Sequence, residues 1–221
     1  MWRLPEMVRV KICGITNERD LENAVIAGAD ALGFVIDVKS SPRNITMDKA
    51  KELMNKAPIF IGKVAVTVFK DLDHLVEIKS ELEPEYIQIH GDLGFDNNYL
   101  SKALCGTHII RAIALKSNSS LELISNEMKN FDAILIDSYI EGKHGGTGLV
   151  NDFRTCREIR KVISPKPLIL AGGLNPDNVE EAVRIVEPFA VDVSSGIEKS
   201  PGMKDFEKML NFVKNARRVK I

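Results

Sequence analysis

The sequence lacks the features that mark secreted, membrane-spanning or nucleic-acid-binding proteins. Its three cysteines are too few for the disulfide framework of a small secreted domain. No apolar run approaches the roughly 18 residues of a membrane-spanning helix, and residues 1–7 carry no apolar signal-peptide core. The formal net charge of −1 provides no strongly basic surface for nucleic acid or for an acidic membrane. We expect a cytoplasmic protein that binds neither nucleic acid nor membranes.

Ligands for a metal ion are also sparse. The four histidines are scattered along the chain, and Cys13, Cys105 and Cys156 do not have the spacing of zinc ligands. We expect no metal and no cofactor. Any chemistry must then come from the side chains and backbone of the chain itself.

The stretch 8–16 carries the clearest local signal. Apolar and charged residues alternate up to Cys13, and this period of two is typical of a β-strand. Gly14 ends the strand, and a helical pattern follows over 18–27. Cys13 is thereby placed at the carboxyl end of a strand, on the same face as Lys11.

Eight strand-like runs recur along the chain, and helix-like runs follow them. The expected strands cover residues 8–13, 31–36, 59–69, 86–91, 108–115, 133–137, 168–171 and 190–193. The expected helices cover 18–27, 47–56, 71–82, 95–104, 152–162 and 204–218, and two more begin with caps at Ser119 or Ser120 and at Asn175. Eight such units in 221 residues predict a single-domain (β/α)8 TIM barrel over residues 1–221, with 1–7 as an N-terminal extension. A doubly wound open sheet is the alternative, but it rarely needs eight strands of such even spacing.

Side chains at the strand ends are the candidates for chemistry, because ligands of parallel α/β proteins bind at the carboxyl ends of the strands. Cys13, His90 and Asp137 each end a predicted strand. A thiolate can take a proton from carbon and a carboxylic acid can give one to oxygen, so Cys13 and Asp137 suit an isomerisation without a cofactor. The alternatives are a buried structural Cys13, a hydrogen-bonded His90 at the rim, and an Asp137 that caps a helix or pairs with Lys143.

Two loops of glycine and serine follow the seventh and eighth predicted strands. They are Gly172-Gly173 and Ser194-Ser195-Gly196, which offer backbone N–H groups with little steric cover. In a barrel these two positions commonly hold a phosphate. The alternative is that the glycines only end the strands.

Charged and polar residues also occur inside the predicted strands. They are Lys11, Lys63, Gln88, Arg111 and Asp192. We expect these side chains to point into the barrel and to form a paired network near its mouth, because outward positions pack under helices. Lys11 is expected to lower the pKa of Cys13.

A series of motifs resembles the phosphoribosylanthranilate isomerase family, which acts in tryptophan biosynthesis. The likeness runs from about residue 8 to residue 218. In chain order the motifs are VKICGIT (10–16), GADALGFV (28–35), SPR (41–43), QIHG (88–91), LID (135–137), GGTG (145–148), LAGGLNP (170–176) and VDVSSGIE (191–198). The chain departs from the family pattern at residues 36–39 and 149–153. These differences concern the contacts that the two loops make.

The resemblance implies a substrate, a reaction and roles for matching residues. The substrate is N-(5-phosphoribosyl)anthranilate, a phosphosugar, and the reaction is an Amadori rearrangement to 1-(2-carboxyphenylamino)-1-deoxyribulose 5-phosphate. Cys13 is implied as general base, Asp137 as general acid, and Arg43 as the group that meets the anthranilate carboxylate. The remaining substrate-binding residues expected are His90, Gly172, Gly173, Asp192, Ser194, Ser195 and Gly196. We expect a monomer or homodimer.

Two related sugar-phosphate barrels are less compatible with these residues. The histidine-pathway isomerase has a carboxylate where Cys13 stands, and indole-glycerol-phosphate synthase needs a lysine acid rather than Asp137. A barrel that binds a phosphate ligand without turning it over is an alternative of a different class. A direct activity assay separates that alternative from an enzyme.

Overall fold

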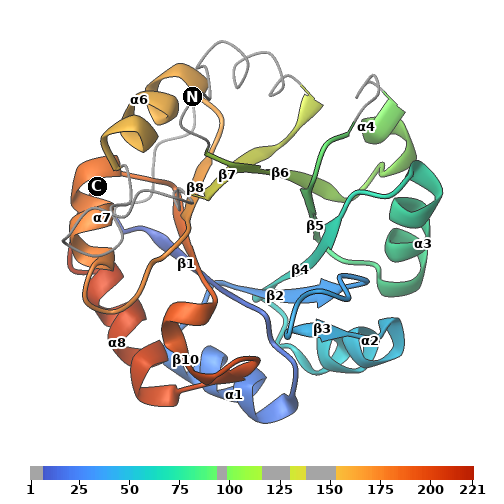
Figure 1. The fold of residues 1–221 in the computed structure, drawn as a ribbon, viewed down its shortest axis with the longest axis horizontal. Coiled ribbons are helices and arrows are strands. Elements are labelled where there is room, and N and C mark those ends of the chain that lie inside the picture. The colour runs from blue at the N-terminus through green and yellow to red at the C-terminus, as the bar shows by residue number, and fades with distance from the viewer. Residues whose placement is uncertain (1–6, 94–98, 116–129, 138–152) are drawn as a thin grey trace.

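The computed structural model describes residues 7–93, 99–115, 130–137 and 153–221. The strands that form its barrel are β1 Arg9–Cys13, β2 Ala31–Ile36, β4 Gly62–Val68, β5 Tyr86–His90, β6 His108–Ala114, β7 Ala133–Asp137, β8 Leu168–Ala171 and β9 Ala190–Val193. All of them pair in parallel, and β1 pairs with both β2 and β9, so the sheet closes into an eight-stranded barrel (Figure 1). The predicted TIM-barrel fold is confirmed.

Helices surround the barrel (Figure 1). The described helices are α1 Glu18–Ala27, α2 Met47–Lys56, α3 Leu72–Leu82, α4 Leu100–Ala103, α6 Phe153–Ile163, α7 Val179–Val186 and α8 Phe206–Ala216. Several begin at a side chain that accepts a backbone N–H of the first turn, as Asn17, Thr46 and Asp71 do for α1, α2 and α3. Among the described segments, every helix is too short or too polar to cross a lipid bilayer.

The strands bury two separate apolar layers, one on each face. The outer layer packs strand residues such as Ile12 and Phe34 against the helices. The inner layer lies inside the barrel, because its strand members alternate with those of the outer layer. Its buried members are Cys13, Val35, Val64, Val66, Ile110, Ala112, Leu135, Ile169, Ala171 and Ala190.

The polar residues inside the strands divide between these two faces. Lys11, Gln88 and Asp192 share the interior face with the inner layer, as predicted. Lys63 and Arg111 do not, because each directly neighbours an inner-layer residue and therefore faces the other way. Lys63 pairs with Glu85 at 3.3 Å. Arg111 donates to the backbone oxygens of Ile89 and Ala112. The prediction of a single interior network was therefore wrong for these two residues.

The apolar residues before β4 do not belong to the strand. The prediction began this strand at residue 59, but Ile59 and Phe60 are 83% and 97% exposed. The backbone N–H groups of Phe60 and Ile61 both donate to the Pro58 oxygen, which forms a turn. β4 begins only at Gly62. The apolar pattern overestimated the strand because exposed apolar residues are common on protein surfaces.

Two helices start later than predicted. The Asn175 side-chain oxygen accepts the backbone N–H groups of Asp177 and Asn178, which forms a turn before α7 rather than a cap on Pro176. The final helix was expected from residue 204, but Lys204 lies in a strand. Asp205 caps α8 by accepting the N–H of Lys208 at 3.0 Å.

Three short strands and one helical turn were not predicted. β3 Asn44–Ile45 pairs with the end of β2. A 3-10 turn, η3 Ser195–Ile197, follows β9 and leads into the antiparallel hairpin of β10 Glu198–Ser200 and β11 Met203–Lys204. Of the expected N-terminal extension, Met7 forms a bridge with Lys220. The predicted cap at Ser119 or Ser120, residues 95–98 and residue 152 lie outside the described residues.

Candidate active site

Cys13 is the last residue of β1, and it is almost completely buried. It lies beside Gly33 of β2 in register. A Cβ atom built on Gly33 would lie 2.7 Å from the Cys13 Sγ and 3.1 Å from the Lys11 Nζ. The thiol and the ammonium group therefore share the space above Gly33, so that a larger side chain there would displace one of them. The sequence contained this glycine within a motif, but gave no sign of its contact with Cys13.

Lys11 and Asp192 form an ion pair beneath Cys13. The Lys11 Nζ lies 2.8 Å from the Asp192 Oδ1, and both side chains are buried. Burial opposes the charge on Lys11, but the attraction of Asp192 and of Cys13 outweighs it and raises the pKa of Lys11 above its usual value. Lys11 is therefore charged, and most of its charge is balanced by Asp192.

The pKa of Cys13 moves in the direction opposite to the prediction. Burial of the thiol raises its pKa above the usual value, and this effect outweighs the lowering by the positive charges of Lys11 and Lys204. The negative charge of Asp192 raises it further. In this site the thiol is therefore mainly protonated at neutral pH.

His90 ends β5 next to Gln88 on the interior face. The Gln88 Nε2 lies 2.8 Å from the His90 Nε2, so the imidazole accepts this hydrogen bond in the arrangement shown. Burial, together with the nearby charge of Lys11, lowers the pKa of His90 to about 4. His90 is a hydrogen-bonded neutral residue of the rim, and its contact with a substrate stays a prediction.

The low pKa of His90 predicts a loss of stability in mild acid. The unfolded chain takes up a proton near pH 6.5, whereas folded His90 does so only near pH 4, so the free energy of unfolding falls as the pH drops between these values. This difference in pKa corresponds to about 2–3 kcal/mol at pH 4. Urea unfolding at pH 7 and pH 4 should show a smaller loss for His90→Gln than for wild type. The exposed His108→Gln variant is the control, and an equal effect of both variants would contradict the prediction.

Asp137 is the last residue of β7 and is half-buried. It shares the face of Leu135, so its side chain is on the interior side of the strand. β8 and β9 separate β7 from β1, and all strands are parallel, so Asp137 and Cys13 lie at the same rim of the barrel. Lys143, the partner in the alternative interpretation, lies outside the described residues.

The two glycine- and serine-containing loops are adjacent, as predicted. Gly172 and Gly173 have φ angles of 87° and 62°, a left-handed backbone that glycine adopts without strain. A Cβ atom on Gly196 would lie 2.0 Å from the Leu174 oxygen, so the loop after β9 packs directly against the loop after β8. Their backbone groups can therefore serve one ligand. That this ligand is a phosphate stays a prediction.

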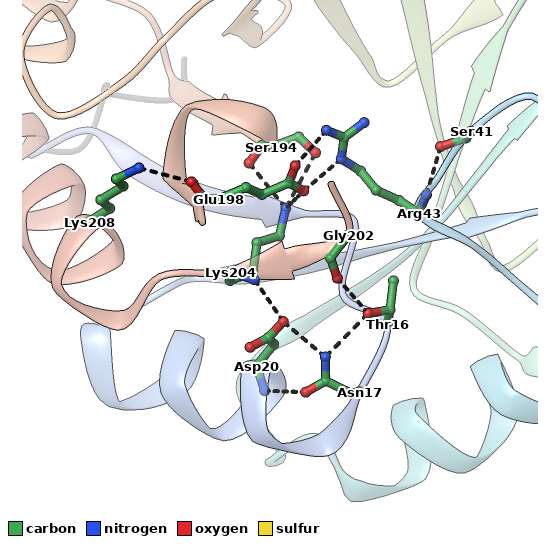
Figure 2. A network of polar contacts seen from close by, with 10 residues as sticks. All are labelled: Thr16, Asn17, Asp20, Ser41, Arg43, Ser194, Glu198, Gly202, Lys204 and Lys208. Carbon is green, nitrogen blue, oxygen red and sulfur yellow. Dashed lines mark hydrogen bonds and ion pairs between the residues drawn. The ribbon is translucent and has the colours of Figure 1, made fainter. Parts of the chain in front are cut away.

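Arg43 reaches the same rim from the loop after β2. A Cβ atom on Gly14 would lie 2.5 Å from the Arg43 Cδ, so the arginine stem crosses the residue that follows Cys13. The Arg43 Nε and Nη2 each donate to a carboxylate oxygen of Glu198 at 2.7 Å. Lys204 donates to the same carboxylate (Figure 2). Neither Glu198 nor Lys204 is among the site residues predicted from the sequence.

The rim therefore combines a thiol, a carboxyl group, a guanidinium group and exposed backbone at two loops. Within the described part of the chain, no three His, Cys, Asp or Glu side chains gather where they could share a metal ion. The groups present can exchange protons and bind anions.

Comparison with known proteins identifies the family. A sequence model of the family described as N-(5'phosphoribosyl)anthranilate (PRA) isomerase matches residues 10–215. The N-(5'-phosphoribosyl)anthranilate isomerase of Methanothrix thermoacetophila is 39% identical over 211 residues, which cover 96% of this chain and 99% of that protein. The chain belongs to the N-(5'-phosphoribosyl)anthranilate isomerase family. It is accordingly an isomerase, and the resemblance noted from its motifs is confirmed.

Solved structures of the isomerase family share its fold. The Thermotoga maritima phosphoribosyl anthranilate isomerase superimposes with a TM-score of 0.82 at 36% identity, covering 95% of this chain and 98% of that one. A second phosphoribosyl anthranilate isomerase structure has a TM-score of 0.80 at 34% identity, with the same shares of the two chains covered. That protein was solved in complex with reduced 1-(o-carboxyphenylamino)-1-deoxyribulose 5-phosphate.

Proposed function

We propose that this chain converts N-(5-phosphoribosyl)anthranilate into 1-(2-carboxyphenylamino)-1-deoxyribulose 5-phosphate in tryptophan biosynthesis, as a cytoplasmic monomer or homodimer. The observation that supports this most directly is the placement of Cys13 and Asp137. They end two strands on the interior side of one rim. The Arg43 stem crosses Gly14, the residue after Cys13, and the two adjacent loops follow β8 and β9, which lie between β7 and β1. This rim has groups suited to proton transfer and groups suited to binding anions.

The reaction needs one acid and one base. Protonated Asp137 gives its proton to the furanose ring oxygen, the C1–O bond breaks, and the nitrogen lone pair forms a C=N bond to C1. The Cys13 thiolate then removes the proton from C2, and the C2–H electrons give an enol amine. The enol amine relaxes to the ketone as C1 takes up a proton and the hydroxyl group on C2 loses its proton. No cofactor takes part, since the substrate is oxidised at C2 and reduced at C1.

The raised pKa of Cys13 bears on this mechanism. A thiolate in this site is scarce at neutral pH, but it is a stronger base than an ordinary thiolate once it forms. Lys11 and Lys204 stabilise that form. The active enzyme is then the fraction with Cys13 deprotonated and Asp137 protonated.

The remaining substrate contacts are proposed from position. The backbone of Gly172, Gly173, Ser195 and Gly196 would bind the phosphate, with Ser194 at the edge of the same loop. Arg43 would bind the anthranilate carboxylate, and guanidinium groups do so with two parallel hydrogen bonds. His90 and Asp192 would line the sugar site from β5 and β9.

A direct assay tests the proposed function. Freshly prepared phosphoribosylanthranilate is fluorescent, and its signal should fall when the protein is added without metal or cofactor. A barrel that only binds the phosphosugar would leave the fluorescence loss at the spontaneous rate. That result, obtained with protein that binds the substrate, would refute the enzymatic function.

Gly33→Ala should impair turnover through Cys13. The added methyl group would lie within 2.7 Å of the thiol sulfur, which must move. A misplacement of about 1 Å can cost about 10²-fold in rate, so we expect kcat to fall by about that factor. Gly62→Ala is a matched control, because its Cβ atom meets the Tyr86 ring at 3.1 Å at the opposite end of the barrel. Steady-state kinetics should separate the two variants, and equal kcat values would show that the space above Gly33 does not matter.

A further inference from the structure

A chain of buried charged contacts connects Arg43 with the loop after β9 (Figure 2). Glu198 begins β10 and Lys204 ends β11, and the two residues are paired in register across this hairpin. Their side chains are almost completely buried, with 6% and 0% exposed. Arg43 and Lys204 approach the Glu198 carboxylate from different sides (Figure 2). The hairpin therefore places the Glu198 carboxylate against the Nε side of the Arg43 guanidinium, the group proposed to bind the substrate carboxylate.

Glu198 orients the Arg43 guanidinium. The Nε and Nη2 atoms donate to Oε1 and Oε2 in a bidentate pair, which fixes the plane of the group. Among the contacts of the described residues, Nη1 donates to no acceptor, so the terminal edge of the guanidinium is available to a ligand. A carboxylate bound there would meet a group that is already oriented.

Lys204 connects Glu198 to the loop expected to bind phosphate. Its Nζ lies 2.9 Å from the Glu198 Oε1 and 3.1 Å from the Ser194 backbone oxygen. These partners are acceptors, as an ammonium group requires. The backbone N–H of Lys204 donates to the buried Asp20 of α1 at 2.9 Å, which anchors the hairpin to the barrel.

The hairpin also touches the loop that carries Arg43. A Cβ atom on Gly202, in the turn of the hairpin, would lie 2.8 Å from the Pro42 oxygen. The Gly202 oxygen in turn accepts a hydrogen bond from the Thr16 hydroxyl at 2.8 Å. The hairpin is therefore held against the loop that carries Arg43 and against the segment that begins α1.

The three charges do not balance. Burial lowers the pKa of Lys204 from its usual value, and the Glu198 carboxylate opposes this effect. With Lys204 protonated, two cations share one carboxylate, so the cluster of three side chains carries a net charge of +1 next to the rim. Burial raises the pKa of Glu198, but hydrogen bonds from Arg43 and Lys204 outweigh it and hold that pKa below its usual value. The carboxylate is therefore ionised at neutral pH, and an anionic ligand would compensate the remaining positive charge.

We propose that Glu198 and Lys204 are positioning residues that hold the Arg43 guanidinium at a fixed distance from the Ser194 loop. The site thereby selects a substrate with a phosphate at one end and an aryl carboxylate at the other. This inference rests on the proposed function, since it concerns how that substrate is recognised. It assigns the two residues no proton transfer.

A charge-conserving double variant separates positioning from charge. Glu198→Gln with Lys204→Met removes one negative and one positive charge, so the cluster keeps its net charge of +1 while Arg43 loses its bidentate partner. Neutral replacement of a buried ion pair commonly preserves folding, which thermal unfolding can verify. The measured quantity is the ratio of kcat/KM for N-(5-phosphoribosyl)anthranilate to kcat/KM for N-(5-phosphoribosyl)aniline, which lacks the carboxylate.

We expect this ratio to fall by about tenfold or more in the double variant, because a loosely held guanidinium loses much of its preference for the carboxylate. Arg43→Ala should reduce the ratio at least as far. Lys208→Met is the matched control, because exposed Lys208 donates to the Glu198 backbone oxygen and not to its carboxylate. Its ratio should equal that of wild type.

Unchanged selectivity in the folded double variant would overturn the positioning role while the proposed function stands. If the double variant unfolds below the assay temperature, Glu198→Asp is tested instead. This substitution keeps every charge but shortens the side chain by one methylene, which moves the carboxylate away from the Arg43 guanidinium. A wild-type ratio in Glu198→Asp would likewise overturn the inference. A wild-type protein that turns over neither substrate would refute the proposed function, and this inference with it.

Discussion

Cys13→Ser should lower kcat by about 10²–10⁴-fold, the usual contribution of a general acid or base. Serine has nearly the size of cysteine, so the contacts of neighbouring groups are preserved. Its hydroxyl is far less acidic than a thiol, however, and hardly any alkoxide forms at neutral pH. Proton removal from C2 should therefore fail while the anion contacts remain. KM should stay within a few-fold of wild type, the pattern of an interaction made mainly in the transition state.

Steady-state kinetics across a pH series checks this prediction. The mechanism also needs protonated Asp137, whose fraction falls as the pH rises. Because burial raises the pKa of Cys13, the thiolate fraction still increases above neutrality and offsets that fall, so wild-type kcat/KM should change little there. Cys13→Ser should lose this offset, and its residual kcat/KM should fall as the pH rises. Cys105→Ser, which changes an exposed thiol, is the control and should behave like wild type. A Cys13→Ser variant with near-normal kcat would show that another group removes the proton.

The positions of the strand-end residues could be predicted because a strand has a fixed period. Alternation placed Cys13 with Lys11, and His90 with Gln88, on one face, and the structure has these residues on the interior face. The glycines after the strands placed both loops next to each other at the rim. These features depend only on neighbouring residues in the chain and on the parallel arrangement of the strands.

The Glu198 and Lys204 contacts could not be predicted in the same way. Lys204 stands just before an apolar helical pattern, so its local sequence favours the first turn of a helix. Its strand conformation instead depends on pairing with Glu198 and on the anchor to Asp20, which is 184 residues away. Periodicity carries no information about such distant partners.

The pKa of Cys13 could not be predicted for a related reason. The sequence shows that a cation, Lys11, is on the same strand face, and a cation alone lowers the pKa of a thiol. The sequence does not show how deeply the thiol is buried or that Asp192 neutralises most of the lysine charge. Depth of burial comes from the closed barrel, and here it decides the direction of the shift.

Asp137→Asn should also lower kcat by about 10²–10⁴-fold, because an amide cannot release the proton that the ring oxygen needs. The amide is isosteric with the carboxyl group, so KM should change little. Asp132→Asn is a matched control, since Asp132 lies just before the same strand and its amide oxygen can still accept the Ile109 N–H. A fall in kcat that is equal in both variants would indicate damage to β7 rather than loss of an acid.

A substrate deuterated at C2 of the ribose distinguishes the acid from the base. Asp137 acts in ring opening, before the C2–H bond breaks, so its loss makes ring opening rate-limiting. The deuterium isotope effect on kcat should then approach one in Asp137→Asn. Cys13 acts on the C2–H bond itself, so Cys13→Ser should show a full isotope effect. If Asp137→Asn instead shows the larger isotope effect, the two residues have exchanged roles, and the assignment of Cys13 as the base and Asp137 as the acid is wrong.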